Sequence, residues 1–179
     1  MISIIIPIFN ESENIPFLLD KLQNLQKKLI SIEVIFVDDG SLDNSFEILK
    51  KASLNNNPWI KIIKLARNTG QTAAIQAGID FATGDILVFL DGDLQNDPDD
   101  IPKLIEKLEE GYDVVSGWRK DRKDNAIKRN LPSRIANWII SFVSGVKLHD
   151  YGCTLKAYRA SVIKNVKLYG EMHRFIPIY

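Results

Sequence analysis

The stretch Asp85-Ile-Leu-Val-Phe-Leu-Asp-Gly-Asp-Leu-Gln95 is an apolar run that ends in two aspartates, Asp91 and Asp93, followed by Gln95. A run of this kind predicts a fully buried strand of a parallel sheet. Two carboxylates one residue apart repel each other, so a divalent cation is the counter-ion that they favour. We therefore expect a metal ion where this strand ends, and a diphosphate as the group that the metal holds.

The sequence on either side alternates short apolar runs with helical patterns. Strands are predicted for residues 2–8, 32–37, 60–65, 86–90 and 113–117. Apolar residues at helical spacing predict helices over residues 15–29, from about 43, over 71–82 and over 101–108. Such βαβα repetition is typical of an α/β fold with a Rossmann-like, mostly parallel sheet and helices on both faces.

Polar turns follow the predicted strands: Asn10-Glu11, Asp38-Asp39-Gly40-Ser41, Arg67-Asn68-Thr69-Gly70 and Asp91-Gly92-Asp93. In parallel sheets ligands bind beyond the carboxyl ends of the strands, where these turns lie. One acidic corner could accept hydrogen bonds from a nucleobase or ribose while the other holds metal and phosphates.

Each of these turns also has a simpler interpretation. Residues 38–41 could be a plain turn, with Asp43 capping the next helix. Arg67 is either a solvated surface charge or a contact to the diphosphate. The backbone amide of Gln71, at the start of a helix, is a further candidate for an anion.

The composition limits the classes of protein to which this chain can belong. The 179 residues fit one domain, which buries roughly 70% of the surface that its unfolded chain exposes. The single cysteine, Cys153, excludes an internal disulfide and fits a reducing compartment. The 23 basic and 23 acidic residues cancel, which argues against nucleic acid as a partner. Signal-peptide features and apolar runs of about 20 residues are absent from the sequence, so we expect a soluble, cytosolic chain.

The charge is nevertheless uneven along the chain. Residues 118–134 hold seven Lys and Arg against two Asp. The charged part, residues 119–129, predicts a loop. An apolar helical face follows over residues 135–146. This face either packs in the core or lies in a membrane interface beside the basic loop, and both interpretations stay open.

Four motifs occur in the order and spacing of family 2 glycosyltransferases with the GT-A fold: Ile6-Pro7-Ile8-Phe9-Asn10-Glu11, Val37-Asp38-Asp39-Gly40-Ser41, Arg67-Asn68-Thr69-Gly70 and Asp91-Gly92-Asp93-Leu94-Gln95. Within that family the chain resembles the polyprenyl-phosphate sugar transferases, including dolichol-phosphate mannose synthases and bactoprenol glucosyl transferases. The resemblance to this subfamily is carried by Gly117-Trp-Arg119, Arg129-Asn-Leu-Pro-Ser133 and Asp150-Tyr-Gly-Cys153-Thr-Leu-Lys-Ala-Tyr158.

The resemblance implies a metal-dependent, inverting transfer of a sugar from a nucleoside-diphosphate sugar to a polyprenyl phosphate (undecaprenyl or dolichyl). The implied nucleotide-binding residues are Pro7, Phe9, Glu11, Asp38, Asp39, Arg67, Gly70 and Asp91. Magnesium or manganese would be held by Asp91, Asp93 and Gln95. The lipid phosphate would be clasped by Arg119, Arg129 and Ser133. Because a phosphate nucleophile is already deprotonated at neutral pH, no strong general base is required.

Other residues are placed by resemblance alone. Asp150, Gly152 and Cys153 are expected near the sugar or the acceptor, with Cys153 as a small packed residue and not a nucleophile. The two histidines, His149 and His173, have no assigned role. Glu171 and Arg174 are possible neighbours of the site.

The resemblance also implies a domain organisation. We expect a single GT-A catalytic domain over residues 1–179, with a nucleotide-sugar-binding core to about 118 and acceptor-side loop and helices over about 119–179. Many relatives continue into transmembrane helices, so we expect a chain truncated before such segments. The full-length protein would then be peripheral or anchored at the cytoplasmic face of the membrane, and a homo-oligomer is among the forms that it could take.

Competing classes fit less well. A calcium loop would need glycine in place of Asn96 and glutamate in place of Pro102. A haloacid dehalogenase-type phosphatase expects Thr or Val where Gln95 stands, and a later acidic motif. A sugar-nucleotide pyrophosphorylase has a glycine-rich N-terminal loop that is absent from this sequence. Two alternatives stay open: a transferase acting on a saccharide hydroxyl, with a carboxylate base such as Asp150, and a non-catalytic nucleotide-sugar-binding module.

Overall fold

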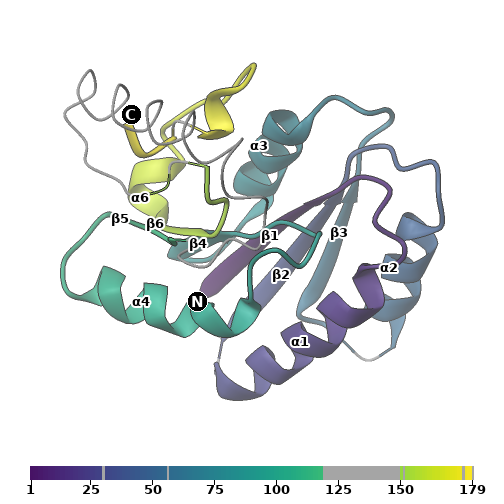
Figure 1. Cartoon of the computed structure of the whole chain (residues 1–179), viewed down its shortest axis with the longest axis horizontal. Coiled ribbons are helices and arrows are strands. Elements are labelled where there is room, and N and C mark those ends of the chain that lie inside the picture. The colour runs from purple at the N-terminus through teal and green to yellow at the C-terminus, as the bar shows by residue number, and fades with distance from the viewer. Residues whose placement is uncertain (30, 56, 119–149, 151, 175, 179) are drawn as a thin grey trace, which may run out of the picture.

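The structure is a computed structural model that describes residues 1–29, 31–55, 57–118, 150, 152–174 and 176–178. It contains a six-stranded sheet in the order β3-β2-β1-β4-β6-β5 (Figure 1). The strands are β1 (Ile2–Ile8), β2 (Ile32–Asp38), β3 (Ile60–Lys64), β4 (Ile86–Phe89), β5 (Val114–Ser116) and β6 (Lys156–Arg159). The helices are α1 (Ile15–Lys28), α2 (Ser45–Leu54), α3 (Gln71–Phe81), α4 (Ile101–Glu109) and α6 (Ala160–Ile163), with 3-10 turns η1 (Pro98–Asp100), η2 (Met172–Arg174) and η3 (Ile176–Ile178).

The first four strands of this order are parallel, as the apolar runs predict. β1 lies between β2 and β4 and pairs with both in parallel, and β3 extends the sheet beside β2. All seven residues of β2 are buried, which is why its sequence shows no polar alternation. The predicted mostly parallel α/β sheet is therefore confirmed, and the ends of the five predicted strands differ from the prediction by at most one residue.

The sixth strand is the part of the sheet that the sequence pattern does not predict. β6 pairs antiparallel with both β4 and β5, so it separates two strands that are neighbours in chain order. Its four residues begin with Lys156 and end with Arg159, and a short run with a charge at each end lacks a strand pattern. A hydrogen bond holds the side chain of Arg159 in place: its Nη2 donates to the carbonyl oxygen of Leu108 at 2.9 Å.

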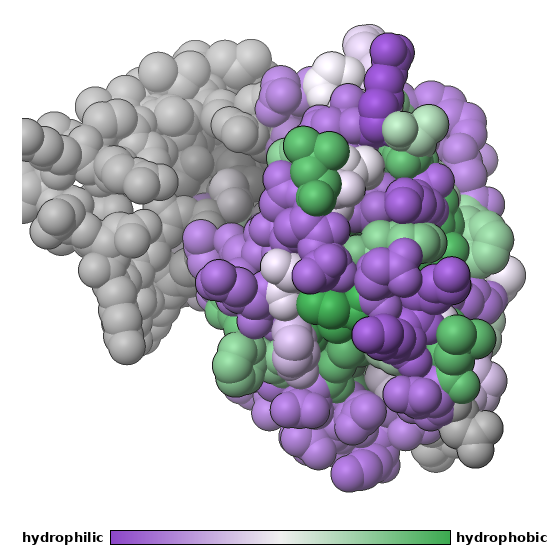
Figure 2. Space-filling view, turned by 90° about the vertical axis from the view of Figure 1, so that its right-hand side faces the viewer, coloured by the Kyte–Doolittle hydropathy of each residue, from purple (hydrophilic) through white to green (hydrophobic). Residues whose placement is uncertain are grey.

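Helices cover both faces of the sheet (Figure 1). One apolar cluster joins α1, α2 and α4 to the sheet through residues such as Leu18, Leu49 and Leu104. The other cluster joins α3 to the opposite face through Ile75 and Ile79. The side at the right of Figure 1 is mostly hydrophilic, as Figure 2 shows. In the part of the chain that the structure describes, no helix combines the length and apolarity needed to cross a bilayer.

The segment after α6 runs beside α3 and contacts it along its length. Near the end of α3, Nζ of Lys164 donates to the carbonyl of Ala82 at 2.7 Å. In the middle, the backbone N–H of Leu168 donates to Oε1 of Gln76 at 2.7 Å. At the first turn, Oγ1 of Thr72 lies 2.6 Å from a ring nitrogen of His173. The start of α3 carries residues of the candidate site, and the segment after α6 therefore holds these residues in place from outside the sheet.

Glu33 on β2 is buried at the end of the sheet away from the candidate site. Burial alone would raise the pKa of this carboxyl, but hydrogen bonds from Lys61, Ser3 and Thr83 outweigh it and hold the pKa at about 2. A carboxyl whose pKa falls on folding stabilises the native state above its unfolded pKa near 4.5 and loses this effect as pH falls toward 2.

We therefore expect Glu33→Gln to lower the free energy of unfolding at pH 7 by about 2–3 kcal/mol. The gap between the two proteins should narrow as pH falls from 4.5 to 2, because the parent carboxyl becomes protonated in that window. Urea unfolding at several pH values measures this gap. Glu106→Gln, at an exposed position of α4, is the matched control. A gap that stays constant with pH would contradict the assignment.

Tyr158 on β6 is fully buried against Phe89, with ring centroids 5.0 Å apart. Its hydroxyl has no hydrogen-bond partner among the described residues, and burial raises the pKa of Tyr158 well above its ordinary value. We expect Tyr158→Phe to leave stability unchanged or to raise it by about 1 kcal/mol, because an unpaired buried hydroxyl is removed. Urea unfolding, with the exposed Tyr169→Phe as control, measures the change. A loss above about 1 kcal/mol would show that the hydroxyl is bonded.

Candidate functional site

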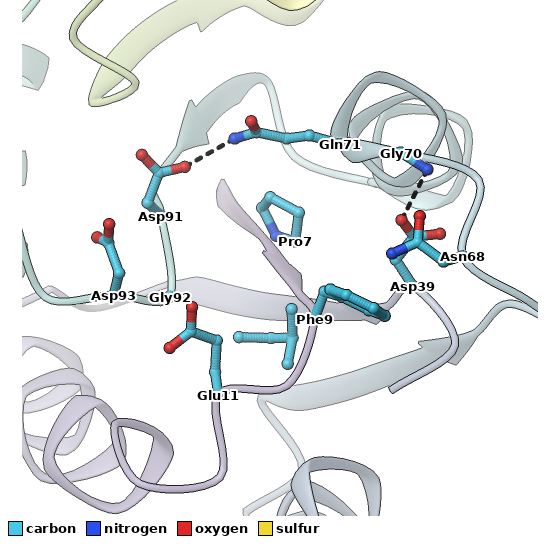
Figure 3. A pocket seen from close by; sticks show the side chains of 11 residues that line it. Pro7, Phe9, Glu11, Asp39, Asn68, Gly70, Gln71, Asp91, Gly92 and Asp93 are labelled. Carbon is cyan, nitrogen blue, oxygen red and sulfur yellow. Dashed lines mark hydrogen bonds between the residues drawn. The ribbon is translucent and has the colours of Figure 1, made fainter. Parts of the chain in front are cut away.

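A cavity of about 350 Å³ opens at the carboxyl ends of β1, β2 and β4. This volume is in the range of about 300–1,000 Å³ that is usual for small-molecule sites. Figure 3 shows an acidic side on the left, a second polar side on the right, and Pro7 and Phe9 between them. The lining residues are Pro7, Ile8, Phe9, Glu11, Asp39, Asn68, Gly70, Gln71, Asp91, Gly92 and Asp93.

The acidic side consists of Asp91, Asp93 and Glu11 (Figure 3). Asp91 Oδ1 accepts a hydrogen bond from Nε2 of Gln71 at 2.8 Å, which joins the end of β4 to the start of α3. Asp93 Oδ1 accepts from the backbone N–H of Gln95 at 3.1 Å. The loop after β4 thus directs two carboxylates at the same cavity.

Glycine at position 92 allows this arrangement. A Cβ at Gly92 would come within 2.5 Å of Cδ1 of Ile8, so with any larger residue either this methyl group or the loop must shift. The next residue but one, Leu94, has a φ of 61°, an uncommon backbone conformation for a leucine. The loop between β4 and η1 therefore combines a close approach with a strained residue, which is frequent at functional sites.

The carboxylate pair fits a hard divalent cation. Carboxylate oxygens are ligands that Mg²⁺ and Mn²⁺ favour, and Mg²⁺ is typically bound through one or two carboxylates together with substrate phosphates and waters. Among the described residues, no cluster of three or more His, Cys, Asp or Glu side chains could hold a metal ion by itself. A metal at Asp91 and Asp93 would complete its coordination with oxygens from waters or from a bound diphosphate.

The opposite side of the cavity is built around Asp39, which is 3% exposed. Its Oδ1 accepts hydrogen bonds from the backbone N–H and the hydroxyl of Thr69, both at 2.8 Å, and its Oδ2 accepts from the N–H of Gly70 at 2.8 Å. Oδ1 already accepts two bonds, so Oδ2 is the oxygen that can accept a further one. The ring of Phe9 lies close by in Figure 3, and an aromatic face of this kind can stack on a nucleobase.

The loops after β1 and β2 hold each other in place. Oγ of Ser41 accepts a hydrogen bond from the backbone N–H of Asn10 at 3.0 Å, and Oγ of Ser45 accepts from the N–H of Glu11 at 2.8 Å. Asp43 accepts from the N–H groups of Ser12 and Ser45, and these bonds outweigh partial desolvation and lower its pKa to about 2. α2 begins at Ser45, about two residues later than the sequence predicts, and its N-cap residue is Asn44 and not Asp43.

The structure brings together most of the predicted nucleotide and metal residues. Those that line the cavity are Pro7, Phe9, Glu11, Asp39, Gly70, Asp91 and Asp93. Asp38 is fully buried next to the cavity-lining Asp39, and its Oδ1 accepts a hydrogen bond from the backbone N–H of Ser41 at 3.3 Å. Arg67 and Gln95 are exposed and do not line this cavity, so their assignments stay predictions.

Three side chains at the cavity were not among the predicted site residues: Ile8, Asn68 and Gln71. For Gln71 the sequence suggested only its backbone amide, whereas the structure uses its side chain to hold Asp91. Asn68 belongs to the motif at residues 67–70, and Gln71 directly follows it. The position of this motif after a predicted strand is the sequence feature that could have identified both residues.

The predicted acceptor residues fall largely outside the described part of the chain. Arg119, Arg129 and Ser133 all lie there, as does His149, to which no role was assigned. Asp150 is described and buried, and its Oδ1 accepts from the N–H of Gly152 at 3.1 Å. Cys153 is buried, with Sγ 3.4 Å from Oδ1 of Asn96, which agrees with a packed residue.

The chain is similar in sequence to known glycosyltransferases. The family model "Glycosyl transferase family 2" matches residues 3–167. The dodecaprenyl-phosphate galacturonate synthase of Rhizobium johnstonii is 48% identical over 99% of this chain and 53% of its own length. An undecaprenyl-phosphate 4-deoxy-4-formamido-L-arabinose transferase of Pseudomonas aeruginosa is 41% identical over 99% of this chain and 52% of its own length. The chain spans about half the length of these curated relatives.

Solved structures share the fold at lower identity. Glucosyl-3-phosphoglycerate synthase of Mycobacterium tuberculosis superposes with a TM-score of 0.70 at 22% identity, over 91% of this chain and 58% of that one. S. aureus TarS superposes with a TM-score of 0.67 at 21% identity, over 98% of this chain and 53% of that one. The first enzyme has been crystallised with Mn²⁺ and UDP, and TarS with UDP.

Proposed function

The chain belongs to glycosyl transferase family 2, and from this premise we propose that it moves a sugar from a nucleoside-diphosphate sugar to a polyprenyl phosphate. The observation that carries the donor half is the cavity itself, with the Asp91 and Asp93 carboxylates at one end and Phe9 with Asp39 at the other. The acceptor half is supported by the relatives at 41–48% identity, whose names specify sugar transfer to dodecaprenyl or undecaprenyl phosphate.

The donor would lie across the cavity with its base at Phe9 and Asp39 and its diphosphate at Asp91 and Asp93. Mg²⁺ or Mn²⁺ bound there would neutralise the charge that grows on the leaving nucleoside diphosphate, an effect worth several kcal/mol. Gln71 orients Asp91 through the 2.8 Å hydrogen bond, so that the carboxylate meets its ligand already positioned. Asn68, beside Asp39, can donate to or accept from the base.

The acceptor phosphate would attack the anomeric carbon in a single displacement with inversion. It is anionic at neutral pH, so it needs positioning and not a strong base. We assign that positioning to Arg119, Arg129 and Ser133. Residues up to about 118 would then form the donor side and residues 119–179 the acceptor side, except that β6 returns to the sheet. The lipid acceptor would bring the reaction to the cytoplasmic face of the membrane.

Nucleotide release tests the proposal. The chain is incubated with UDP- and GDP-linked sugars, Mn²⁺ and a short polyprenyl phosphate, and the freed nucleotide is measured. The proposal predicts release that requires both the metal and the lipid phosphate. Release that is indifferent to the lipid would favour a saccharide hydroxyl as acceptor. Metal-dependent binding of donor without any release would favour a non-catalytic binding module.

Arg129→Ala is expected to raise the KM for the lipid phosphate by about ten- to a hundredfold, because one charge-assisted hydrogen bond of about 1.5–3 kcal/mol is lost. The affinity for the donor should stay unchanged. Lys123→Ala, which removes the same charge from the same segment, is the control. Equal effects of the two substitutions would show that the segment acts only through its net charge.

A further inference from the structure

The first turn of α3 has no side-chain cap. Its N-cap residue is Gly70, which has no side chain that could accept a hydrogen bond from the first N–H groups of the helix. These N–H groups have no partner within a helix, and helix ends fray when other contacts do not hold them. Gln71 is the first residue of this turn, so its position depends on contacts that come from other parts of the chain.

Thr72, the second residue of α3, makes one such contact. Its side chain is buried, at 5% exposure, and its Oγ1 lies 2.6 Å from Nδ1 of His173. His173 belongs to η2, in the segment that lies beside α3 in Figure 1. The two residues are 101 positions apart in the chain. This hydrogen bond therefore ties the first turn of α3 to a segment that follows the last strand of the sheet.

The residue before Thr72 contacts the candidate metal site. Nε2 of Gln71 donates to Oδ1 of Asp91 at 2.8 Å, as the dashed line in Figure 3 shows. Because the two residues are consecutive in one helical turn, a shift of Thr72 moves the backbone of Gln71 with it. A glutamine side chain loses rotamer freedom when it makes a hydrogen bond, so a displaced backbone weakens that bond. Two hydrogen bonds thus connect η2 to a carboxylate of the acidic side.

A second contact of the same segment provides an internal comparison. Gln76, on the next turn of α3, accepts a hydrogen bond from the backbone N–H of Leu168 at 2.7 Å. Its Nε2 donates to Asp80 at 2.8 Å, and its side chain does not line the cavity. If the segment only stabilises α3, the contacts at Thr72 and Gln76 should matter in the same way. If it positions the metal site, only the contact at Thr72 should affect metal binding.

We infer that Thr72 is a positioning residue for metal binding: held by His173, it sets the place of Gln71 and thereby the orientation of the Asp91 carboxylate. The inference rests on the proposed function, because it takes Mg²⁺ or Mn²⁺ to bind at Asp91 and Asp93 together with the diphosphate. It gives the segment after α6 a part in donor binding, although none of the residues described there lines the cavity.

Titration of Mn²⁺ into the chain in the presence of UDP or GDP, followed by electron paramagnetic resonance, tests this role. Thr72→Val keeps the shape of the side chain but removes its hydroxyl. It is expected to raise the Kd for Mn²⁺ about two- to tenfold, because one hydrogen bond is lost. Thr72→Ser keeps the hydroxyl and should have a Kd near that of the parent chain. Nucleotide affinity without metal should be the same in all three proteins.

Gln76→Met is the matched control, because it removes the other contact of the same segment. It should lower the melting temperature measured by circular dichroism and leave the Kd for Mn²⁺ unchanged. His173→Ala should weaken Mn²⁺ binding as Thr72→Val does, and the double variant should bind no more weakly than either single variant, because both remove one contact.

Three results would overturn the positioning role: an unchanged Kd for Mn²⁺ in Thr72→Val, an equal loss in Thr72→Ser, or an equal loss in Gln76→Met. Weaker Mn²⁺ binding in His173→Ala alone would also overturn it, since the effect would then not pass through Thr72. A parent chain that binds no Mn²⁺ together with the nucleotide would overturn the proposed function itself, which distinguishes the two failures.

Discussion

Asp93→Asn is expected to lower sugar transfer by at least about a thousandfold, which corresponds to about 4 kcal/mol of transition-state stabilisation. The substitution keeps the shape of the side chain and its bond to the N–H of Gln95, but it removes one of two negative charges that face the cavity. The bound metal would then be too weakly held to neutralise the leaving diphosphate. The fold should stay intact, because Asp93 is not part of the core.

Initial rates of nucleotide release at saturating donor measure this effect. Asp99→Asn is the control, because Asp99 belongs to η1, a few residues further along the chain, and its ion pair within the described part of the chain is with the half-exposed Lys28. Its activity should equal that of the parent. Residual activity of Asp93→Asn above about a tenth of the parent value would show that Asp93 does not bind the catalytic metal.

Gly40→Ala is expected to lower the free energy of unfolding by about 3 kcal/mol or more. Gly40 has a φ of 70°, which costs a residue with a side chain about 1–2 kcal/mol. In addition, the new Cβ would lie 2.5 Å from the carbonyl carbon of Arg67, a backbone atom that cannot move alone. The loop at residues 67–70 would be displaced, and with it the N–H groups of Thr69 and Gly70 that bind Asp39.

Gly111→Ala separates strain from steric clash. Gly111 also has a positive φ, 109°, but a Cβ there would meet no atom within 4 Å. Its replacement should cost only the backbone strain, about 1–2 kcal/mol. Urea unfolding gives both values, and nucleotide titration should show weaker binding for Gly40→Ala alone. Equal destabilisation by the two substitutions would contradict the packing of the two loops.

The parallel part of the fold was predictable because its strands are buried on both faces. β1, β2 and β4 are nearly continuous apolar runs, and such runs with helices between them leave few possible topologies. β6 was not predictable in this way. Its place in the sheet depends on long-range pairing of Tyr158 with Leu87 and Val114, and nothing within its four residues encodes those partners.

The candidate site was predictable for residues fixed by their position after a strand. Asp39, Asp91 and Asp93 line one cavity because parallel strands place their carboxyl ends at one edge. The side-chain contact between Gln71 and Asp91 depends instead on how α3 packs on the sheet, which spacing does not reveal. Gln95 is exposed and does not line this cavity, and no residue pattern marks the positive φ of Leu94 directly before it.

The most direct test of the metal-bridged diphosphate is electron paramagnetic resonance of Mn²⁺ titrated into the chain with and without UDP or GDP. We expect Mn²⁺ to bind weakly alone and more tightly with the nucleotide, because the carboxylate pair and the diphosphate supply ligands together. Asp91→Asn and Asp93→Asn should each abolish this joint binding. Nucleotide affinity that is the same with and without Mn²⁺, or unaffected by both substitutions, would contradict the account.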